Sequence, residues 1–226
     1  MILALAGCGR IGFDPVADGP GGGIRQVSFG ETGCPACVET YSGVTRDTSL
    51  HSATPQLNFG AFDQVKVDSN PPGVALLRFE LSALPPSTQV VAAELHVYIL
   101  ADTANAGAVS QVFRVLESWD EGTGTSAGTI GAASWQERTA GVAWLAAGAA
   151  PPSRDTVVLG QLQPTMADTT YVIPFGPDGL QTIGDWIRDQ TSNNGFELVL
   201  GSNGGWTFQS GESVHPRPVL VLSVSG

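Results

Sequence analysis

Short stretches in which every second residue is apolar recur along this chain, and glycine or proline separates them. One such stretch covers residues 75–81 and ends at Leu84-Pro85-Pro86, and the next covers residues 93–99. A period of two is typical of a strand with one buried face. Further strands are expected at residues 109–115, 156–159, 170–175, 196–200, 205–209 and 218–224. The pattern therefore predicts an all-β protein.

Length and composition agree with this fold class. The chain has 226 residues, of which 42% are hydrophobic, and it contains 29 glycines and 15 prolines. A chain of this length can form one β-sandwich or barrel with a packed core, and frequent glycine and proline suit many tight turns. We expect this single domain to cover residues 41–226.

One segment departs from the period of two. Leu180, Ile183, Trp186 and Ile187 recur at helical spacing and would share one face of a helix. We expect a short helix near residues 179–190 that caps the sandwich, and Asn193-Asn194-Gly195 would then turn into the next strand.

The net charge limits the classes of partner. The formal charge is −11 and the isoelectric point is about 4.4. Such a surface repels phosphate backbones, so nucleic acid is not an expected partner.

The N-terminal region contains a candidate lipidation site. Leu5-Ala6-Gly7-Cys8 matches the bacterial lipoprotein cleavage box, which makes residues 1–7 a signal remnant and Cys8 the anchor. The alternative is a turn of small residues with a buried cysteine. Residues 8–40, with the spacer at residues 18–23, are expected to form a Gly/Pro-rich tether. The resulting location is the bacterial outer membrane or cell surface, with the membrane contacted only through the lipid.

Once Cys8 is assigned to the anchor, an even pair of cysteines remains. An exported location is oxidising, so we expect a disulfide between Cys34 and Cys37. The spacing Cys34-Pro35-Ala36-Cys37 also occurs in thiol oxidoreductases, but no helix pattern follows it. A closed zinc site would need further Cys or His ligands.

Several short motifs occur in a fixed order between residues 41 and 224. Together they resemble the DNRLRE-type domain, a family of bacterial secreted β-sandwiches grouped with the family-96 carbohydrate-binding modules. The resemblance implies a jelly-roll β-sandwich of two antiparallel sheets that binds polysaccharide without catalysis. The motifs that carry it are Asp47-Thr48, Asn58-Phe59-Gly60, Leu77-Arg78-Phe79-Glu80-Leu81, Trp119-Asp120-Glu121-Gly122, Asn194-Gly195-Phe196, Phe208-Gln209-Ser210-Gly211-Glu212 and Arg217-Pro218-Val219-Leu220.

Sugar binding needs flat apolar rings and planar polar groups. Long loops on a rigid scaffold often carry binding residues, which favours the two tryptophans of the segment 122–148. Polar alternates of the strand at residues 93–99 would form a second surface, joined by two arginines. The alternatives are core tryptophans and a solvated outer face. The candidate ligand-binding residues are Trp135, Trp144, Glu94, His96, Tyr98, Arg78 and Arg114.

Structural calcium is an open alternative. Extracellular sandwiches use this ion to fix loops through carboxylates. Asp47, Asp63 and Asp68 lie in or beside expected turns and are the candidate ligands, with Asp120-Glu121 as further turn acids. The alternative, which the usual exposure of acidic residues favours, is that they are ordinary solvated acids of turns.

One pattern leaves an enzyme open. Gly124-Thr125-Ser126-Ala127-Gly128 matches G-x-S-x-G, and Asp185 and His215 follow in hydrolase order. The expected context of a strand followed by a helix is missing there, so the sequence favours a protein without catalytic activity. Three hypotheses result: a glycan-binding surface lipoprotein, a structural or adhesive surface domain that contacts protein or matrix, and a polysaccharide hydrolase or lyase.

Overall fold

The computed structural model describes residues 23–30, 34, 36–41, 45–100, 108–214 and 216–226. Strands form most of this part of the chain, as the period of two predicts. In chain order the elements are β1 (Arg25–Gly30), β2 (Glu39–Tyr41), β3 (Thr45–His51), β4 (Gln64–Ser69), β5 (Pro72–Phe79), β6 (Gln89–Ile99), β7 (Ser110–Arg114), β8 (Glu137–Thr139), β9 (Val142–Ala143), η1 (Ala147–Ala149), β10 (Gly160–Leu162), β11 (Thr169–Pro174), α1 (Pro177–Arg188), η2 (Gln190–Ser192), β12 (Phe196–Leu200), β13 (Gly205–Gln209) and β14 (Val219–Ser225).

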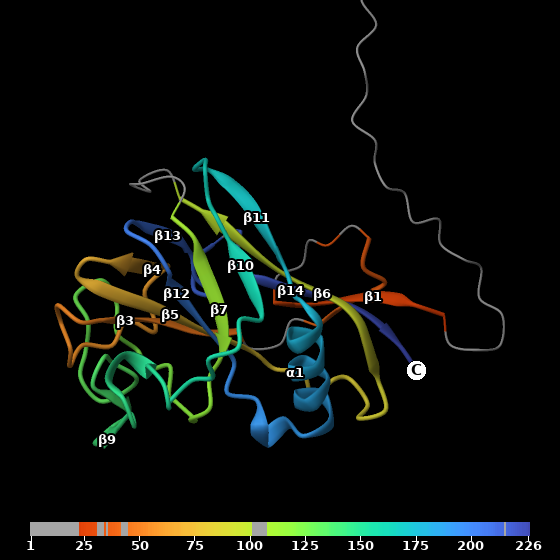
Figure 1. The fold of residues 1–226 in the computed structure, drawn as a ribbon, viewed down its shortest axis with the longest axis horizontal. Coiled ribbons are helices and arrows are strands. Elements are labelled where there is room, and N and C mark those ends of the chain that lie inside the picture. The colour runs from red at the N-terminus through yellow and green to blue at the C-terminus, as the bar shows by residue number, and fades with distance from the viewer. Residues whose placement is uncertain (1–22, 31–33, 35, 42–44, 101–107, 215) are drawn as a thin grey trace, which may run out of the picture.

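The strands form a β-sandwich, which confirms the all-β prediction. In one layer β5 pairs with β3 along one edge and with β12 along the other, and β7 and β10 follow. In the other layer β6 lies between β11 and β14, and β1 and β2 follow. The β4–β13 pair connects the two layers by hydrogen bonds. Figure 1 shows β3, β4 and β5 on one side of the molecule and β1, β6 and β14 on the other.

The main core lies between the layers and is built from the inward alternates of both. Leu95 and Val97 of β6 pack in the same cluster as Leu77 of β5, Leu198 of β12 and Leu222 of β14. Burial of such side chains contributes roughly 1.5–3 kcal/mol each. The apolar residues that recur at every second position of the sequence are thus the residues that form this core.

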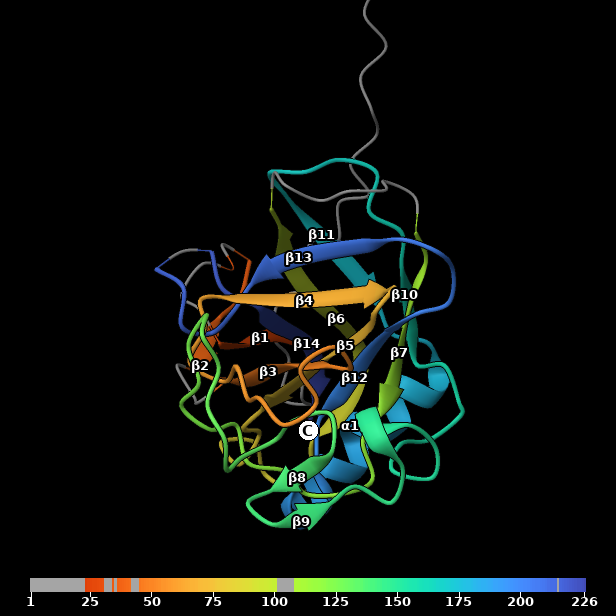
Figure 2. The same ribbon diagram turned by 90° about the vertical axis from the view of Figure 1, so that its left-hand side faces the viewer.

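A second, smaller core covers the opposite face of the β3–β5 layer. Leu76 of β5 and Leu50 of β3 are buried there against Val115, Trp119 and Trp144. These last residues belong to the long segment between β7 and β10, residues 115–159, which we call the excursion. The excursion contains the two-stranded sheet of β8 and β9, which lies below β4 and β13 in Figure 2.

The helix forms where the 3.6-residue period predicts it. Pro177 occupies its first turn with Asp178 beside it, and both are favourable residues at a helix N-terminus. Ile183, Trp186 and Ile187 face the main core, and the Trp186 ring meets the Phe196 ring edge-on at 4.8 Å. No helix in the described part of the chain is long and apolar enough to cross a membrane.

Three sequence expectations need correction. The sandwich does not begin at Tyr41, because β1 lies within the expected tether of residues 8–40 and pairs along its whole length with β14, burying Val27 and Phe29. One strand pair is not antiparallel, since β2 runs parallel to β1. Residues 156–159 form no strand, and the strand that follows is β10. Residues 1–7 and Cys8 lie outside the described residues.

Candidate functional site

A groove of about 930 Å³ lies over the outer face of β4 and β13, and we call it the β4 groove. Figure 2 shows these two strands side by side across the face turned to the viewer. Because Val65 and Val67 point into the main core, the alternates Gln64, Lys66 and Asp68 point outward into the groove. Residues of the loop that follows β3, together with Ser126 of the excursion and residues 203–205, form its walls.

The charged side chains in the β4 groove form a pair. Nζ of Lys66, the only lysine of the chain, lies 2.8 Å from Oδ2 of Asp68. Partial burial acts to raise the pKa of Asp68, but hydrogen bonds from Lys66 and from the Asn70 N–H outweigh it, and the pKa lies below its usual value. Lys66 and Asp68 therefore present a cation and a carboxylate side by side, which suits binding of hydroxyl groups.

An aromatic wall closes one side of the β4 groove. The His51 ring lies 4.7 Å from the Phe59 ring, and Phe62 is partly buried beside them. Burial lowers the pKa of His51 to about 4, and the Lys66 charge acts in the same direction, so the imidazole is neutral at neutral pH. Its Nε2 is buried and has no hydrogen-bond partner among the described residues.

Asn58 holds this wall in place. Its Nδ2 donates to the carbonyls of Glu121 and Ala133, and its Oδ1 accepts from the N–H groups of Gly60 and Gly124. The motif Asn58-Phe59-Gly60 is thus a junction between the loop after β3 and the excursion. It fixes Phe59 at the groove.

Sequence reasoning did not identify the β4 groove, although a signal was present. Gln64, Lys66 and Asp68 alternate with two valines just as the polar residues of β6 alternate with apolar ones. Trp206 also borders the groove, but only 2% of it is exposed, and its Nε1 donates to Ser110 Oγ at 2.7 Å. This tryptophan is part of the core.

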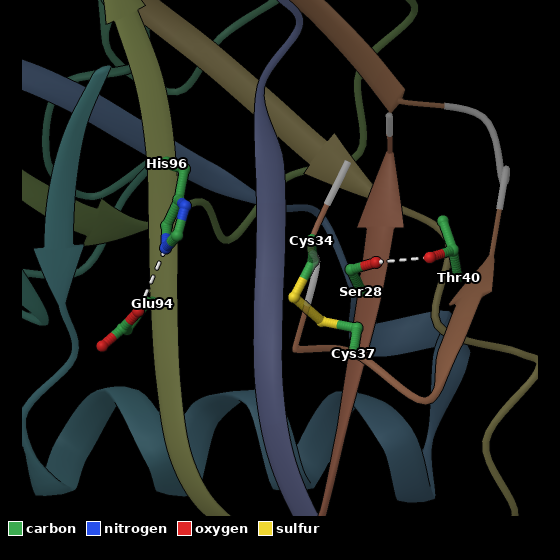
Figure 3. The surroundings of a disulfide bond; sticks show 6 residues. All are labelled: Ser28, Cys34, Cys37, Thr40, Glu94 and His96. Atoms are coloured by element: carbon green, nitrogen blue, oxygen red, sulfur yellow. Dashed lines mark hydrogen bonds and ion pairs between the residues drawn. A yellow bond between two sulfur atoms is a disulfide. The ribbon is translucent and has the colours of Figure 1, made fainter. Parts of the chain in front are cut away.

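The predicted residues of β6 do share one face. Glu94, His96 and Tyr98 point away from the main core, and Nε2 of His96 lies 3.0 Å from Oε2 of Glu94. Glu94 and His96 border a second cavity of about 290 Å³, which Tyr98 does not line. The Cys34–Cys37 turn forms another side of this cavity (Figure 3).

The two arginines do not join this surface, so that part of the prediction is wrong. Arg78 of β5 lies over the Trp119 ring, 5.7 Å from its centroid, and Arg114 of β7 lies 6.0 Å from the centroid of Trp186. Both strands belong to the other layer, so the arginines contact core tryptophans instead.

Trp144 is not a ligand platform. It is 5% exposed, and its Nε1 donates to the Ser134 carbonyl at 2.9 Å. The apolar face of β5 needs a cover, and Trp144 supplies it. Trp135 is partly buried against the same cluster and lies directly over Gly148, where a Cβ would come within 2.6 Å of the ring. A ligand role for Trp135 stays a prediction.

The predicted calcium ligands do not form a site. Asp47 is buried, Asp63 is exposed, and Asp68 pairs with Lys66. The described residues contain no group of three or more His, Cys, Asp or Glu side chains that could hold a metal ion. Calcium binding itself stays a prediction without assigned residues.

Asp47 instead belongs to a partly buried set of acids. Its backbone N–H donates to Oε1 of Glu121 at 2.7 Å, and its Oδ2 accepts from the Gly211 N–H at 2.7 Å. Burial raises the pKa of Asp47 well above its usual value, with a further contribution from the Glu212 charge. Burial likewise raises the pKa of Glu212, and that of Glu121 to about 7. These groups join β3, the excursion and the loop after β13.

The remaining candidates have different outcomes. The disulfide between Cys34 and Cys37 is present, as predicted. Ser126 borders the β4 groove, whereas Asp185 lies on α1, where it pairs with Arg188. Because α1 packs against the main core, these two hydrolase candidates lie on separate parts of the structure. His215 lies outside the described residues.

Comparison with known proteins relates part of this chain to a family of carbohydrate-binding modules. Residues 38–127 match the model of carbohydrate-binding module family 96. A comparison with the curated proteins found no match. The matched region includes the loop after β3 and all of β4, and so it contains most of the side chains that line the β4 groove.

Proposed function

The chain carries a domain similar to the family-96 carbohydrate-binding modules, and we propose that it is a non-catalytic protein that holds a polysaccharide in the β4 groove. The observation that carries this proposal is that the family match, residues 38–127, contains most of the residues that line the β4 groove. A volume of about 930 Å³ is also within the ~300–1,000 Å³ typical of ligand sites.

The side chains of the β4 groove suit a sugar chain. Phe62 and the His51–Phe59 pair offer apolar surfaces for the C–H faces of sugar rings. Lys66 donates hydrogen bonds, the Asp68 carboxylate accepts them, and the Gln64 amide does both. This combination supports binding of a ligand that carries many hydroxyl groups.

Affinity gel electrophoresis tests the proposal. The probes are a soluble β-glucan, a xylan, a galactomannan and a polyuronate, each cast separately into a native gel. We expect at least one of them to slow the wild-type protein. Lys66→Ala and Phe62→Ala should each weaken that retention by about tenfold, the effect of losing one charge-assisted hydrogen bond or one ring contact.

Gln161→Ala is the matched control, because Gln161 is an exposed polar residue on β10, outside the groove. It should be retained like the wild type. A folded wild-type protein that none of the four polysaccharides retains would contradict carbohydrate binding. If both groove variants are retained as strongly as the wild type, the polysaccharide binds outside the β4 groove.

We further propose that Cys8 carries a lipid that holds the protein at the outer membrane or cell surface. The motif Leu5-Ala6-Gly7-Cys8 supports this anchor. Expressed in a bacterial host, the protein should fractionate with membranes, and Cys8→Ala should appear in the soluble exported fraction. An unchanged distribution between the two fractions would count against the lipid.

A structural or adhesive role is the second candidate function. It is favoured by Ile130 and Leu145, two large apolar residues of the excursion that are 74% and 71% exposed. Each of these side chains offers an apolar contact to a protein partner. If the polysaccharides fail while immobilised matrix protein retains the wild type, and Leu145→Ser abolishes that retention, this second role replaces the first.

A further inference from the structure

The cavity beside the disulfide lies apart from the β4 groove and shares no lining residue with it. We call it the disulfide cavity. Its floor is Val219 and Val221, the outward alternates of β14, whose inward neighbours Leu220 and Leu222 belong to the main core. In Figure 3, His96 and Glu94 lie on one side of β14 and the Cys34–Cys37 bond lies on the other.

The disulfide wall of this cavity is held by several bonds. The Cys34–Cys37 bond closes the turn, and the Cys37 N–H donates to the Cys34 carbonyl at 3.0 Å. The Val38 N–H donates to the Gln26 carbonyl at 2.9 Å, which ties the turn to β1. The wall therefore stands in a defined position over the sheet, and the Gln26 side chain completes the lining.

The chemistry of the lining is specific. The floor is a pair of valines, and three planar polar side chains surround it: a carboxylate, an imidazole and an amide. A sugar ring fits this lining, because its C–H face can lie on the valines while its hydroxyl groups form hydrogen bonds with the polar side chains. The volume of about 290 Å³ lies at the lower end of the ~300–1,000 Å³ typical of ligand sites. The occupant is therefore small.

The charges around the disulfide cavity favour an uncharged ligand over an anionic one. Glu94 is exposed, and its only described ion-pair partner is His96. Arg25 nearby on β1 is paired with Glu39. A carboxylated sugar would meet the Glu94 carboxylate without a free cation from the lining residues, whereas an uncharged sugar offers hydroxyl donors to it.

We propose that the disulfide cavity is a second carbohydrate subsite, which takes one uncharged sugar ring. The proposal rests on the proposed function for the class of ligand. Two separate subsites on one module allow a polysaccharide to engage it twice, which raises the overall affinity above that of either site.

NMR titration with monosaccharides tests this subsite without a polymer. The probes are glucose, galactose, mannose, xylose and N-acetylglucosamine, each added to the full chain. We expect at least one to shift the Val219 and Val221 methyl signals and the His96 ring signals in a saturable way. His96→Ala should weaken that binding about tenfold. Lys66→Ala, in the β4 groove, should leave it unchanged.

The outcomes separate this subsite from the groove. If none of the five sugars shifts these signals while a polysaccharide still retards the protein in a Lys66-dependent manner, the subsite is wrong and the groove stands. If the valine signals shift but Lys66→Ala does not affect polysaccharide retention, the subsite stands and the groove is wrong. If Tyr98→Ala, on the same face but outside the lining, abolishes the shifts while the protein stays folded, the assignment to this cavity is also overturned.

Discussion

Strands β5 and β6 lie in the two layers of one sandwich, yet they are buried in different ways. In β5 the consecutive residues 74–77 are each at most 5% exposed, so the strand is covered on both faces. In β6 only alternate residues are buried, and Glu94, His96 and Tyr98 remain on an open face. The outward alternates differ to match, since Val74 and Leu76 make that face of β5 apolar while those of β6 are polar, and only the apolar face carries a cover.

The cover of β5 is the excursion. Its tryptophans Trp119 and Trp144 lie in the second core with Leu76. No comparable segment among the described residues lies over Glu94 and His96, where both cavity-lining side chains meet solvent. Trp119 and Trp144 therefore stabilise the fold, because they cover an apolar sheet face that would otherwise meet solvent. The face of β6 that carries Glu94 and His96 has no such cover and stays a candidate binding surface.

Trp144→Ala gives the largest expected effect, because it removes the cover of β5. A buried tryptophan truncated to alanine costs about 3–5 kcal/mol of unfolding free energy. Trp144 also loses its hydrogen bond to Ser134. Urea unfolding followed by circular dichroism measures this loss.

Tyr98→Ala is the control for this comparison, since it lies on the open face of β6. It should cost less than about 1 kcal/mol, as is usual for residues away from a core. Equal losses for the two variants would mean that the excursion is not a structural cover.

The next expected effect concerns a buried ion pair between the excursion and β12. Nε of Arg154 lies 3.0 Å from Oε2 of Glu197, which is 1% exposed, and the guanidinium lies 3.9 Å from the Phe113 ring centroid. Burial raises the pKa of Glu197 well above its usual value, and the Arg154 charge offsets only part of this increase. Arg154→Ala leaves this carboxyl alone in the interior, and we expect a loss of about 3 kcal/mol.

The double variant Arg154→Met with Glu197→Leu is the control, because replacing both charges by apolar side chains restores packing without an orphaned carboxyl. Differential scanning calorimetry should place it between the wild type and Arg154→Ala. If Arg154→Ala unfolds like the wild type, the pair does not attach the excursion.

The same contrast shows what the sequence could predict. The main core follows from the period of two, and α1 follows from the spacing of Ile183, Trp186 and Ile187, because both depend on neighbours within one element. The role of Trp144 depends on Leu76, which is distant in the sequence, and no local pattern reports that contact.

Strand β1 escapes the sequence pattern for a related reason. Val27 and Phe29 have the spacing of two buried alternates, but the strand follows a Gly/Pro-rich spacer, and its burial depends on pairing with β14 at the other end of the chain. In contrast, Gln64, Lys66 and Asp68 alternate with two valines, so the sequence alone predicts that these three side chains lie on the outward face of β4. What the sequence does not contain is the wall of His51 and Phe59 that turns this face into a groove.

A smaller effect is expected at the disulfide on the open side. The Cys34–Cys37 bond closes a short turn, and a loop of this length gives about 2 kcal/mol in the chain-entropy model. The double variant Cys34→Ser with Cys37→Ser should lose at most this amount in urea, and it should keep the circular dichroism of the wild type. Loss of the whole fold would instead mean that this turn contributes as much to stability as the excursion does.

The smallest expected effect is a pH dependence that separates the acids Asp47, Glu121 and Glu212 from His51 in the β4 groove. The folded-state pKa of Glu121, about 7, is above its ordinary value of 4.5, chiefly through burial. The folded protein therefore binds more protons than the unfolded chain between these values, and stability falls as the pH rises from about 4.5 to 7. Burial also raises the pKa values of Asp47 and Glu212, so their titration adds to this fall in stability. The Asp47 N–H and the charges of Arg46 and Arg78 act to lower the pKa of Glu121.

His51 in the β4 groove has the opposite sign. Its folded-state pKa of about 4 is below the ordinary 6.5, so its contribution makes the protein more stable as the pH rises between these values. Comparing wild type with Glu121→Gln at each pH cancels this contribution. Because Glu121 is partly exposed and its charge is screened, we expect the wild type to lose only about 1 kcal/mol more than Glu121→Gln between pH 5.5 and 8.0 in urea unfolding. Parallel pH profiles for the two proteins would show that the carboxyl at Glu121 titrates like an acid in water, and the excursion would then be less tightly packed over β3 than over β5.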